Sequence, residues 1–246
     1  MNTTTAILLP SAFFVAALLY SSVGHAGASA YLAVMALASM EPAVMKPTAL
    51  TMNLLVAIIA SYNFARAGHF SWRHFWPLAI ASIPCAYLGG AITAPPAAYR
   101  LIVGAVLFFT AMRMLAIPGG APRHDPRPPP VLVALPVGAL IGLLSGLTGV
   151  GGGIFLSPLL ILAGWASIQT ASGVAAVFIF MNSAAGLLGL GSKVWRVPGE
   201  IIFWLPAALL GGVLGSYWGS RRLPIPTLRR FLAVVLIIAG AKLMLT

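Results

Sequence analysis

Ten long apolar stretches, separated by short polar segments, occupy most of this 246-residue chain. Only 14 basic and 3 acidic side chains are present, so charged residues make up 7% of the sequence, whereas soluble domains contain about 25%. Because so few charges could not cover the surface of a soluble fold, most of that surface must face lipid. The sequence therefore predicts an all-α polytopic membrane protein, with the lipid bilayer as its main partner.

The lengths of these stretches indicate where helices are interrupted. Stretches 26–40 and 153–166 have roughly 15 residues, and a helix of that length reaches only about 22 Å of the roughly 30 Å hydrocarbon core. Each directly follows a cluster of glycines, so we interpret 6–40 and 131–166 as broken or re-entrant helix pairs. We expect about 8–10 helical segments, near 6–22, 26–40, 47–65, 75–94, 99–117, 131–148, 153–166, 170–190, 200–219 and 230–245.

The segment 118–130 divides the chain almost in half. Its prolines lack backbone donors and its charged residues favour water, which is typical of a solvated linker. We therefore expect a first membrane repeat at 1–117, a cytoplasmic linker at 118–130 and a second membrane repeat at 131–246. Three pairs of features recur in the same order in the two halves and favour duplication: Gly24–Gly27 with Gly149–Gly152, Pro84–Gly90 with Pro206–Gly212, and Arg100 and Arg113 with Arg229 and Lys242.

The distribution of basic residues favours an inverted relation between the two halves. In the first half, Arg66 and Arg73 lie in the loop 66–74, whereas in the second half the densest basic cluster follows the segment 200–219. Since basic loops stay in the cytoplasm, the second repeat would be upside down relative to the first, with both termini outside. If 6–40 instead crossed the bilayer once, as a single kinked span, the two halves would be parallel.

Inverted repeats with interrupted helices are typical of secondary transporters, which bind their solute near the midplane of the bilayer. A passive channel and a structural subunit of a membrane complex are the alternatives. An intramembrane enzyme would need a nucleophile with its base, paired carboxylates or a metal cluster. The sequence contains no such set, so we expect no catalytic residue, metal or cofactor. The net charge of +11 lies in short clusters without interleaved aromatic residues, which excludes nucleic acid as a partner.

The two glycine clusters are the first candidates for a solute site. Gly149, Gly151, Gly152 and Gly153 leave backbone N–H groups free at the start of a short helix, where the helix dipole favours an anion. In the first half, a matching set adds imidazole and hydroxyl donors and consists of Gly24, His25, Gly27 and Ser29. The alternative is that these glycines only allow helices to pack closely, as small residues commonly do in membranes.

Polar side chains within two apolar segments form a second candidate layer. They are Thr48, Thr51 and Asn53 in segment 47–65, and Ser172, Asn182 and Ser183 in segment 170–190. Asn53 and Asn182 are the strongest candidates of this layer, since an unpaired amide is costly in hydrocarbon. The alternative is that these groups only bond neighbouring helices.

His25 is the ionisable side chain that we expect at a glycine break inside the membrane. Such a residue indicates function, and histidine titrates near neutral pH, which suits proton coupling. The alternative is a neutral histidine bonded to a nearby carbonyl. Lys46 and Lys193 are expected to snorkel at segment ends, where either could attract an anion. A relay of buried carboxylates is not expected, because all the acids lie at segment ends or in the linker: Glu41, Asp125 and Glu200.

The second glycine cluster and the residues after it carry a family resemblance. Gly149–Leu160, followed by Gln169–Gly173, resembles the signature of the TauE/SafE membrane permeases, and Val23–Ser29 with Lys46–Leu50 resembles it more loosely. Membership would imply a bacterial inner-membrane carrier for small anions such as sulfite or organosulfonates, driven by an ion gradient. It would also place the solute route at the two glycine clusters, and Ser157 of the motif would be one of the solute-binding residues. The solute, the direction of transport and the existence of a homo-oligomer stay open.

Overall fold

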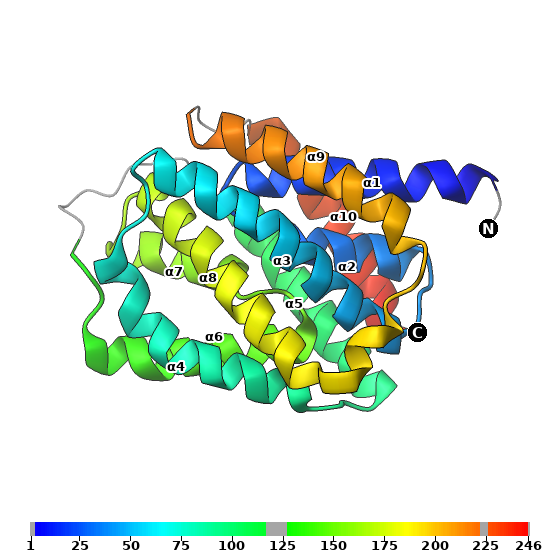
Figure 1. The fold of residues 1–246 in the computed structure, drawn as a ribbon, viewed down its shortest axis with the longest axis horizontal. Helices are drawn as coiled ribbons and strands as arrows, with labels where there is room; N and C mark the ends of the chain where they lie inside the picture. The colour runs from blue at the N-terminus through cyan, green and yellow to red at the C-terminus, as the bar shows by residue number, and fades with distance from the viewer. Residues whose placement is uncertain (1–2, 117–126, 222–225, 246) are drawn as a thin grey trace.

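The computed structural model describes residues 3–116, 127–221 and 226–245. These residues form ten α-helices, one 3₁₀-helix (η1) and no strand. The elements are α1 (Thr3–Ser21), α2 (Ala28–Leu37), α3 (Pro42–Arg66), α4 (Trp72–Ala91), α5 (Pro96–Ala116), α6 (Val131–Thr148), α7 (Gly153–Leu162), α8 (Ile168–Leu190), η1 (Gly191–Arg196), α9 (Ile201–Gly219) and α10 (Pro226–Leu245). Each of the ten predicted stretches forms a helix, so the all-α fold is confirmed. Figure 1 shows the helices of the two halves lying side by side in one bundle.

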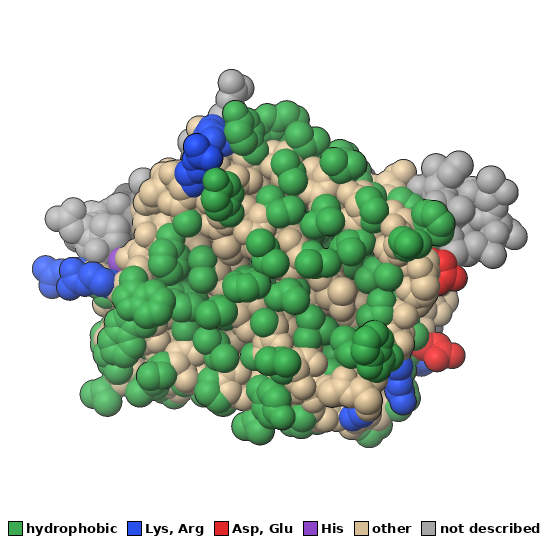
Figure 2. Space-filling model, in the orientation of Figure 1, with side chains coloured by type: hydrophobic (Ala, Val, Ile, Leu, Met, Phe, Trp, Pro, Cys, Tyr) green, Lys and Arg blue, Asp and Glu red, His purple; other side chains and the backbone are tan. Residues whose placement is uncertain are grey.

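Within the described residues, four helices are long and apolar enough to cross a membrane. They are α3, α6, α8 continued by η1, and α9. Large apolar side chains cover the face seen in Figure 2, and some are almost fully exposed, for example Leu132 at 88%. Such a surface is stable in lipid and unfavourable in water. Of the predicted linker, residues 118–126 lie outside the described part of the chain, and of the basic cluster after α9 only Arg221 has a described side chain.

Both predicted helix breaks are present. The segment 22–27 separates α1 from α2, and the segment 149–152 separates α6 from α7. The short helices α2 and α7 have 10 residues each, fewer than the roughly 15 expected from the lengths of the apolar stretches. A helix of this length spans about 15 Å, half of the hydrocarbon core. Neither helix is therefore long enough to cross the hydrocarbon core by itself.

Helices from different halves pack together through two ladders of glycine. On α6, Gly138, Gly142 and Gly146 face the backbone carbonyls of Leu78, Ser82 and Ala86 on α4, and a methyl group on any of these glycines would lie 2.0–2.2 Å from a carbonyl oxygen. On α9, Gly211 and Gly215 face the carbonyls of Phe14 and Leu18 on α1, and Gly219 faces that of Ser22 just after α1. In both pairs the residue numbers rise together, so the paired helices are parallel. Small residues at every fourth position allow this close approach of two backbones.

The two central helices, one from each half, run in opposite directions. Leu50 contacts Gly186, and Asn53 bonds Ser183, so α3 and α8 run antiparallel. Helices that correspond in two inverted repeats must run antiparallel. Because α4 packs on α6 and α1 on α9, the two halves interlock instead of forming separate bodies. The inverted repeat and its boundaries at 1–117 and 131–246 stay predictions.

Lys46 differs from its predicted place. We expected it to snorkel at a segment end, but α3 begins at Pro42 and the Lys46 side chain is buried, with 7% of its surface exposed. Its ammonium group donates to the carbonyl oxygens of Gly89, Gly90 and Ile92, at 3.0, 2.9 and 3.1 Å. These carbonyls end α4 and have no intrahelical donor, so the lysine satisfies them and interacts favourably with the negative end of the helix dipole.

Candidate functional site

The two helix breaks meet inside the bundle. The Nε2 atom of His25, in the first break, lies 3.0 Å from the carbonyl oxygen of Gly153, the first residue of α7. A carbonyl only accepts hydrogen bonds, so the proton of this imidazole is on Nε2 and is donated across the interface. This contact joins residues 128 positions apart. It places the one predicted ionisable group between the two glycine clusters.

Two buried asparagines lie beside the second break. Asn53 on α3 donates from Nδ2 to the Val150 carbonyl at 3.3 Å and to the Ser183 hydroxyl at 3.2 Å. Asn182 on α8 accepts from the Ser82 hydroxyl at 2.9 Å. Both amides are fully buried, yet Asn53 Oδ1 and Asn182 Nδ2 have no hydrogen-bond partner among the described residues. Buried amides with spare hydrogen-bonding capacity are rare and indicate a ligand, a solvent molecule or a second conformation.

Gly151 and Gly152 turn the backbone between these two amides. Their φ angles are +80° and +83°, a region that other L-residues rarely adopt. A methyl group on Gly151 would lie 2.3 Å from Asn53 Nδ2, and one on Gly152 would lie 3.5 Å from Asn182 Nδ2. The N–H groups of Gly151, Gly152 and Gly153 have no backbone acceptor among the described residues. The break therefore presents N–H donors at the positive end of α7, next to unpaired amide atoms.

The first break is more tightly filled. Gly24 lies against the Ser172 backbone, and a methyl group there would be 2.2 Å from its carbonyl oxygen. Gly27 directly precedes α2 and lies against the ring of Tyr31, whose hydroxyl donates to the Ala26 carbonyl at 2.6 Å. Ser29 is buried. The sequence left open whether the glycines serve only close packing. In the first break, close packing explains why Gly24 and Gly27 are glycines.

The remaining predicted residues do not gather at the His25–Gly153 contact. Thr48 is buried and donates to the Val44 carbonyl of its own helix at 2.7 Å. Thr51 is half-buried on α3, and Gly149 ends α6 against the backbone of Lys46. Ser157 on α7 is buried, and its hydroxyl has no partner among the described residues. Ser82, which bonds Asn182, was not among the predicted residues, although a lone hydroxyl in an apolar stretch could have identified it.

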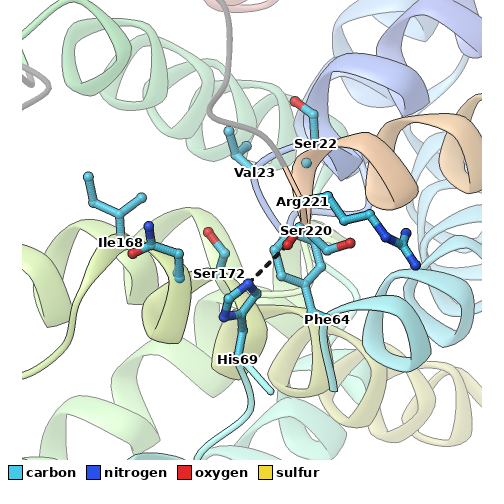
Figure 3. Close-up of a pocket in the computed structure, with 10 residues that line it drawn as sticks. Ser22, Val23, Phe64, His69, Ile168, Ser172, Ser220 and Arg221 are labelled. Carbon is cyan, nitrogen blue, oxygen red and sulfur yellow. Dashed lines mark hydrogen bonds between the residues drawn. The ribbon is translucent and has the colours of Figure 1, made fainter. Parts of the chain in front are cut away.

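A cavity of about 210 Å³ lies at the end of the bundle where α3 and α9 end and α8 begins; we name it cavity 1. His69 and Ser172 are among its lining residues, and His69 Nε2 donates to the Ser220 carbonyl at 3.0 Å (Figure 3). The Arg221 guanidinium stacks on the ring of Tyr217, 3.8 Å from its centre, and turns away from the other labelled residues (Figure 3). Cavity 1 is therefore polar, and Arg221, the arginine among its described lining residues, is engaged by Tyr217.

A second cavity of about 180 Å³, which we name cavity 2, lies at the opposite ends of α3 and α8. It opens between the first turn of α3, the end of α4, the start of α5 and η1. Lys46, Lys193 and Arg196 line it. None of its described lining residues is acidic.

Each cavity approaches one of the two helix breaks. Val23 of the first break lines cavity 1, while Leu147, two residues before the second break, lines cavity 2. Tyr99 also lines cavity 2, and its hydroxyl donates to the Thr148 carbonyl at 3.0 Å, next to Gly149. The contacts of His25 and Asn53 with the second break lie between the cavities. The arrangement is that of a membrane transport protein, with a polar centre between two entrances.

Comparison with known proteins gives the family. The chain belongs to the sulfite exporter TauE/SafE family, whose model matches residues 9–243. It is 40% identical to the probable membrane transporter protein y4hK of Sinorhizobium fredii, over 98% of this chain and 99% of that protein. It is 30% identical to the probable membrane transporter protein MamO of Magnetospirillum gryphiswaldense, over 45% of this chain and 18% of that protein. No solved structure matches the chain significantly. The protein is thus a multi-pass membrane transporter and not an enzyme.

Proposed function

We propose that this transporter is a secondary carrier that moves a small oxyanion, such as sulfite or an organosulfonate, across the bacterial inner membrane with proton coupling. The observation that carries the proposal is the second helix break. The N–H groups of Gly151–Gly153 have no backbone acceptor among the described residues. Nearby, the Nδ2 atom of Asn182 and the hydroxyl of Ser157 have no hydrogen-bond partner among these residues. Donors at the positive end of a helix favour an anion.

The charges of the described residues also favour an anion. Basic side chains line both cavities: Arg221 in cavity 1, and Lys46, Lys193 and Arg196 in cavity 2. The described acids, Glu41 and Glu200, are exposed at helix starts and line neither cavity. A cation would meet no compensating carboxylate along this route, whereas an anion would meet favourable potential at both entrances.

The separation of the two cavities supports a carrier over a passive channel. Cavity 1 ends at the first break, cavity 2 ends at Leu147 just before the second, and His25 bonds Gly153. A solute could pass only if these contacts opened in turn, which is alternating access. A channel remains the second candidate, and transport kinetics distinguish the two.

The positions of the basic loops indicate which end of the protein would face the cytoplasm. Both termini lie at the right-hand end of Figure 1. The loop with Arg66 and Arg73 lies at the other end, where His69 bonds Ser220 and thereby brings Arg221 to the same side. Positive loops stay in the cytoplasm, so this end, with cavity 1, would face the cytoplasm and cavity 2 the periplasm.

Flux into liposomes tests the proposed function. Purified protein is reconstituted, a pH gradient is imposed, and uptake of radiolabelled sulfite, sulfoacetate and a carboxylate control is followed. Saturable, gradient-dependent flux of an oxyanion, reduced by unlabelled competitor, is expected. Flux that does not saturate and ignores the pH gradient would indicate a channel. Absence of oxyanion flux from vesicles that contain folded protein would contradict the proposal.

Replacing His25 with glutamine should remove the pH dependence of flux. Glutamine can still donate to the Gly153 carbonyl but cannot titrate. The change in flux with pH should therefore fall to less than about twofold in His25→Gln, over the pH range in which the flux of the unaltered protein changes. The same measurement on His74→Gln, which alters a histidine bonded to Ser71 and Trp165 outside the breaks, should show the unaltered profile. If the pH profile of flux in His25→Gln equals that of the unaltered protein, His25 does not take part in proton coupling.

A further inference from the structure

Cavity 2 has a chemistry of its own. Three cationic side chains line a space of about 180 Å³, and no described residue of its wall is acidic. Cavities for drug-sized ligands are larger, about 300–1,000 Å³, so the space suits a small ion with part of its hydration shell. Unpaired cations that share a small cavity are electrostatically unfavourable unless an anion joins them.

Lys46 supplies a charge that cannot turn away from this cavity. All three of its ammonium protons are donated to the carbonyls at the end of α4. The lysine is therefore held in the wall as a positive charge, partly offset by the helix dipole. Because the Lys46 side chain is already fixed, an anion could bind next to it without any rearrangement of the cavity 2 wall.

Lys193 and Arg196 are the movable cations of cavity 2. Lys193 donates to the Thr93 hydroxyl across the cavity, and its ammonium group repels that of Lys46. Arg196 is exposed at the end of η1. Neither forms an ion pair within the part of the chain that the structure describes. An anion would relieve the repulsion between the lysines and accept charge-assisted hydrogen bonds from Lys193 and Arg196.

The first turn of α3 adds one backbone donor. Pro42 and Ala43 of this turn line cavity 2, and since proline has no N–H group, the donor is that of Ala43. The first N–H groups of a helix have no intrahelical acceptor and carry the positive end of the dipole. Cavity 1 is different, because its arginine, Arg221, stacks on Tyr217. Among the described lining residues, cavity 2 therefore carries more cationic side chains than cavity 1.

We infer that cavity 2 is an oxyanion-binding vestibule, in which Lys193 and Arg196 hold a small divalent oxyanion above Lys46 before it reaches the second helix break. The inference deepens the proposed function by naming a binding step and a charge preference at one end of the route. Tyr99 links the vestibule to the break through its bond to the Thr148 carbonyl. A divalent anion is favoured over chloride because two cations can each pair with a different oxygen.

Equilibrium binding to the purified full-length protein in detergent tests the vestibule without requiring transport. The probe is radiolabelled sulfate, a stable divalent oxyanion. The double substitution Lys193→Gln and Arg196→Gln should raise its Kd by at least about tenfold, since two charge-assisted hydrogen bonds are lost. The matched control is Arg66→Gln with Arg73→Gln, which removes the same charge from exposed positions at the opposite end and should change the Kd by less than about twofold.

Three results would overturn the inference: no sulfate binding by the unaltered protein, an unchanged Kd in the cavity 2 variant, or equal losses in both variants. Liposome flux then separates this inference from the proposed function. If oxyanion flux is present but the cavity 2 substitutions do not affect sulfate binding, the vestibule is refuted and the carrier function is supported. If the cavity 2 variant loses sulfate binding but the unaltered protein transports no oxyanion, the vestibule is supported and the carrier function is refuted.

Discussion

Replacing both Gly151 and Gly152 with leucine should abolish anion transport while the protein still inserts into the membrane. Both residues have φ near +80°, which costs a leucine about 1–2 kcal/mol each. The new side chains would also collide with Asn53 and with the ring of Phe178. Overpacking adds about 1–3 kcal/mol per site. The summed cost exceeds about 3 kcal/mol, which corresponds to a loss of flux of at least about 100-fold. Uptake by proteoliposomes measures it.

The matched control for this variant is Gly68→Leu with Gly164→Leu. These two glycines also have positive φ, at +78° and +68°, but nothing lies within 4 Å of the position that a methyl group would take. They therefore reproduce the backbone strain without crowding the break. The control should keep its flux, and membrane fractionation should recover both variants equally. Unchanged transport in the Gly151 and Gly152 variant would exclude the second break from the solute route.

A single leucine at Gly142 should destabilise the whole bundle. This glycine is the middle rung of the α6 ladder, and a methyl group there would lie 2.1 Å from the Ser82 carbonyl oxygen. The neighbour is backbone of a packed helix and cannot rotate away, so the helices must separate. We expect a loss of about 3 kcal/mol, the upper part of the range for overpacking. In a chain of this length, that lowers the melting temperature by about 6–12 °C, measurable by thermal unfolding in detergent.

Gly199→Leu is the control for the ladder. Nothing lies within 4 Å of the position of its added side chain, in the loop before α9. Its melting temperature should remain that of the unaltered protein. If Gly142→Leu has the same melting temperature as this control, α4 and α6 are not in close contact in the membrane.

The membrane class and the helix breaks could be predicted because both depend on local properties of the chain. Apolar stretches of sufficient length must be helical in lipid, since no water satisfies their backbone groups. The run Gly149, Val150, Gly151, Gly152 and Gly153 interrupts such a stretch, and three of its glycines do adopt positive φ. The true lengths of α2 and α7 were not predictable, because hydropathy does not distinguish the last helical turn from an apolar loop.

The candidate site was predictable only in part. Asn53 and Asn182 were preferred because buried amides need partners, and the structure places both beside the second break. Thr48 has the same apparent polarity in the sequence, but it bonds the carbonyl of Val44 one turn earlier. A threonine can satisfy itself within its own helix, whereas an asparagine amide reaches across to others. The chemistry of the side chain therefore carried more information than its position in a polar layer.

By itself, the sequence determined that this protein is surrounded by lipid, which stretches form helices and where the chain breaks after two glycine clusters. Those properties follow from hydropathy and from the backbone freedom of glycine. Only the tertiary structure decided that α6 packs on α4 and α9 on α1, that Lys46 ends α4, and that two cavities approach the breaks from opposite ends. Apolar helices of similar composition are nearly interchangeable by hydropathy, so their partners are selected by shape and by the polar groups that each must satisfy.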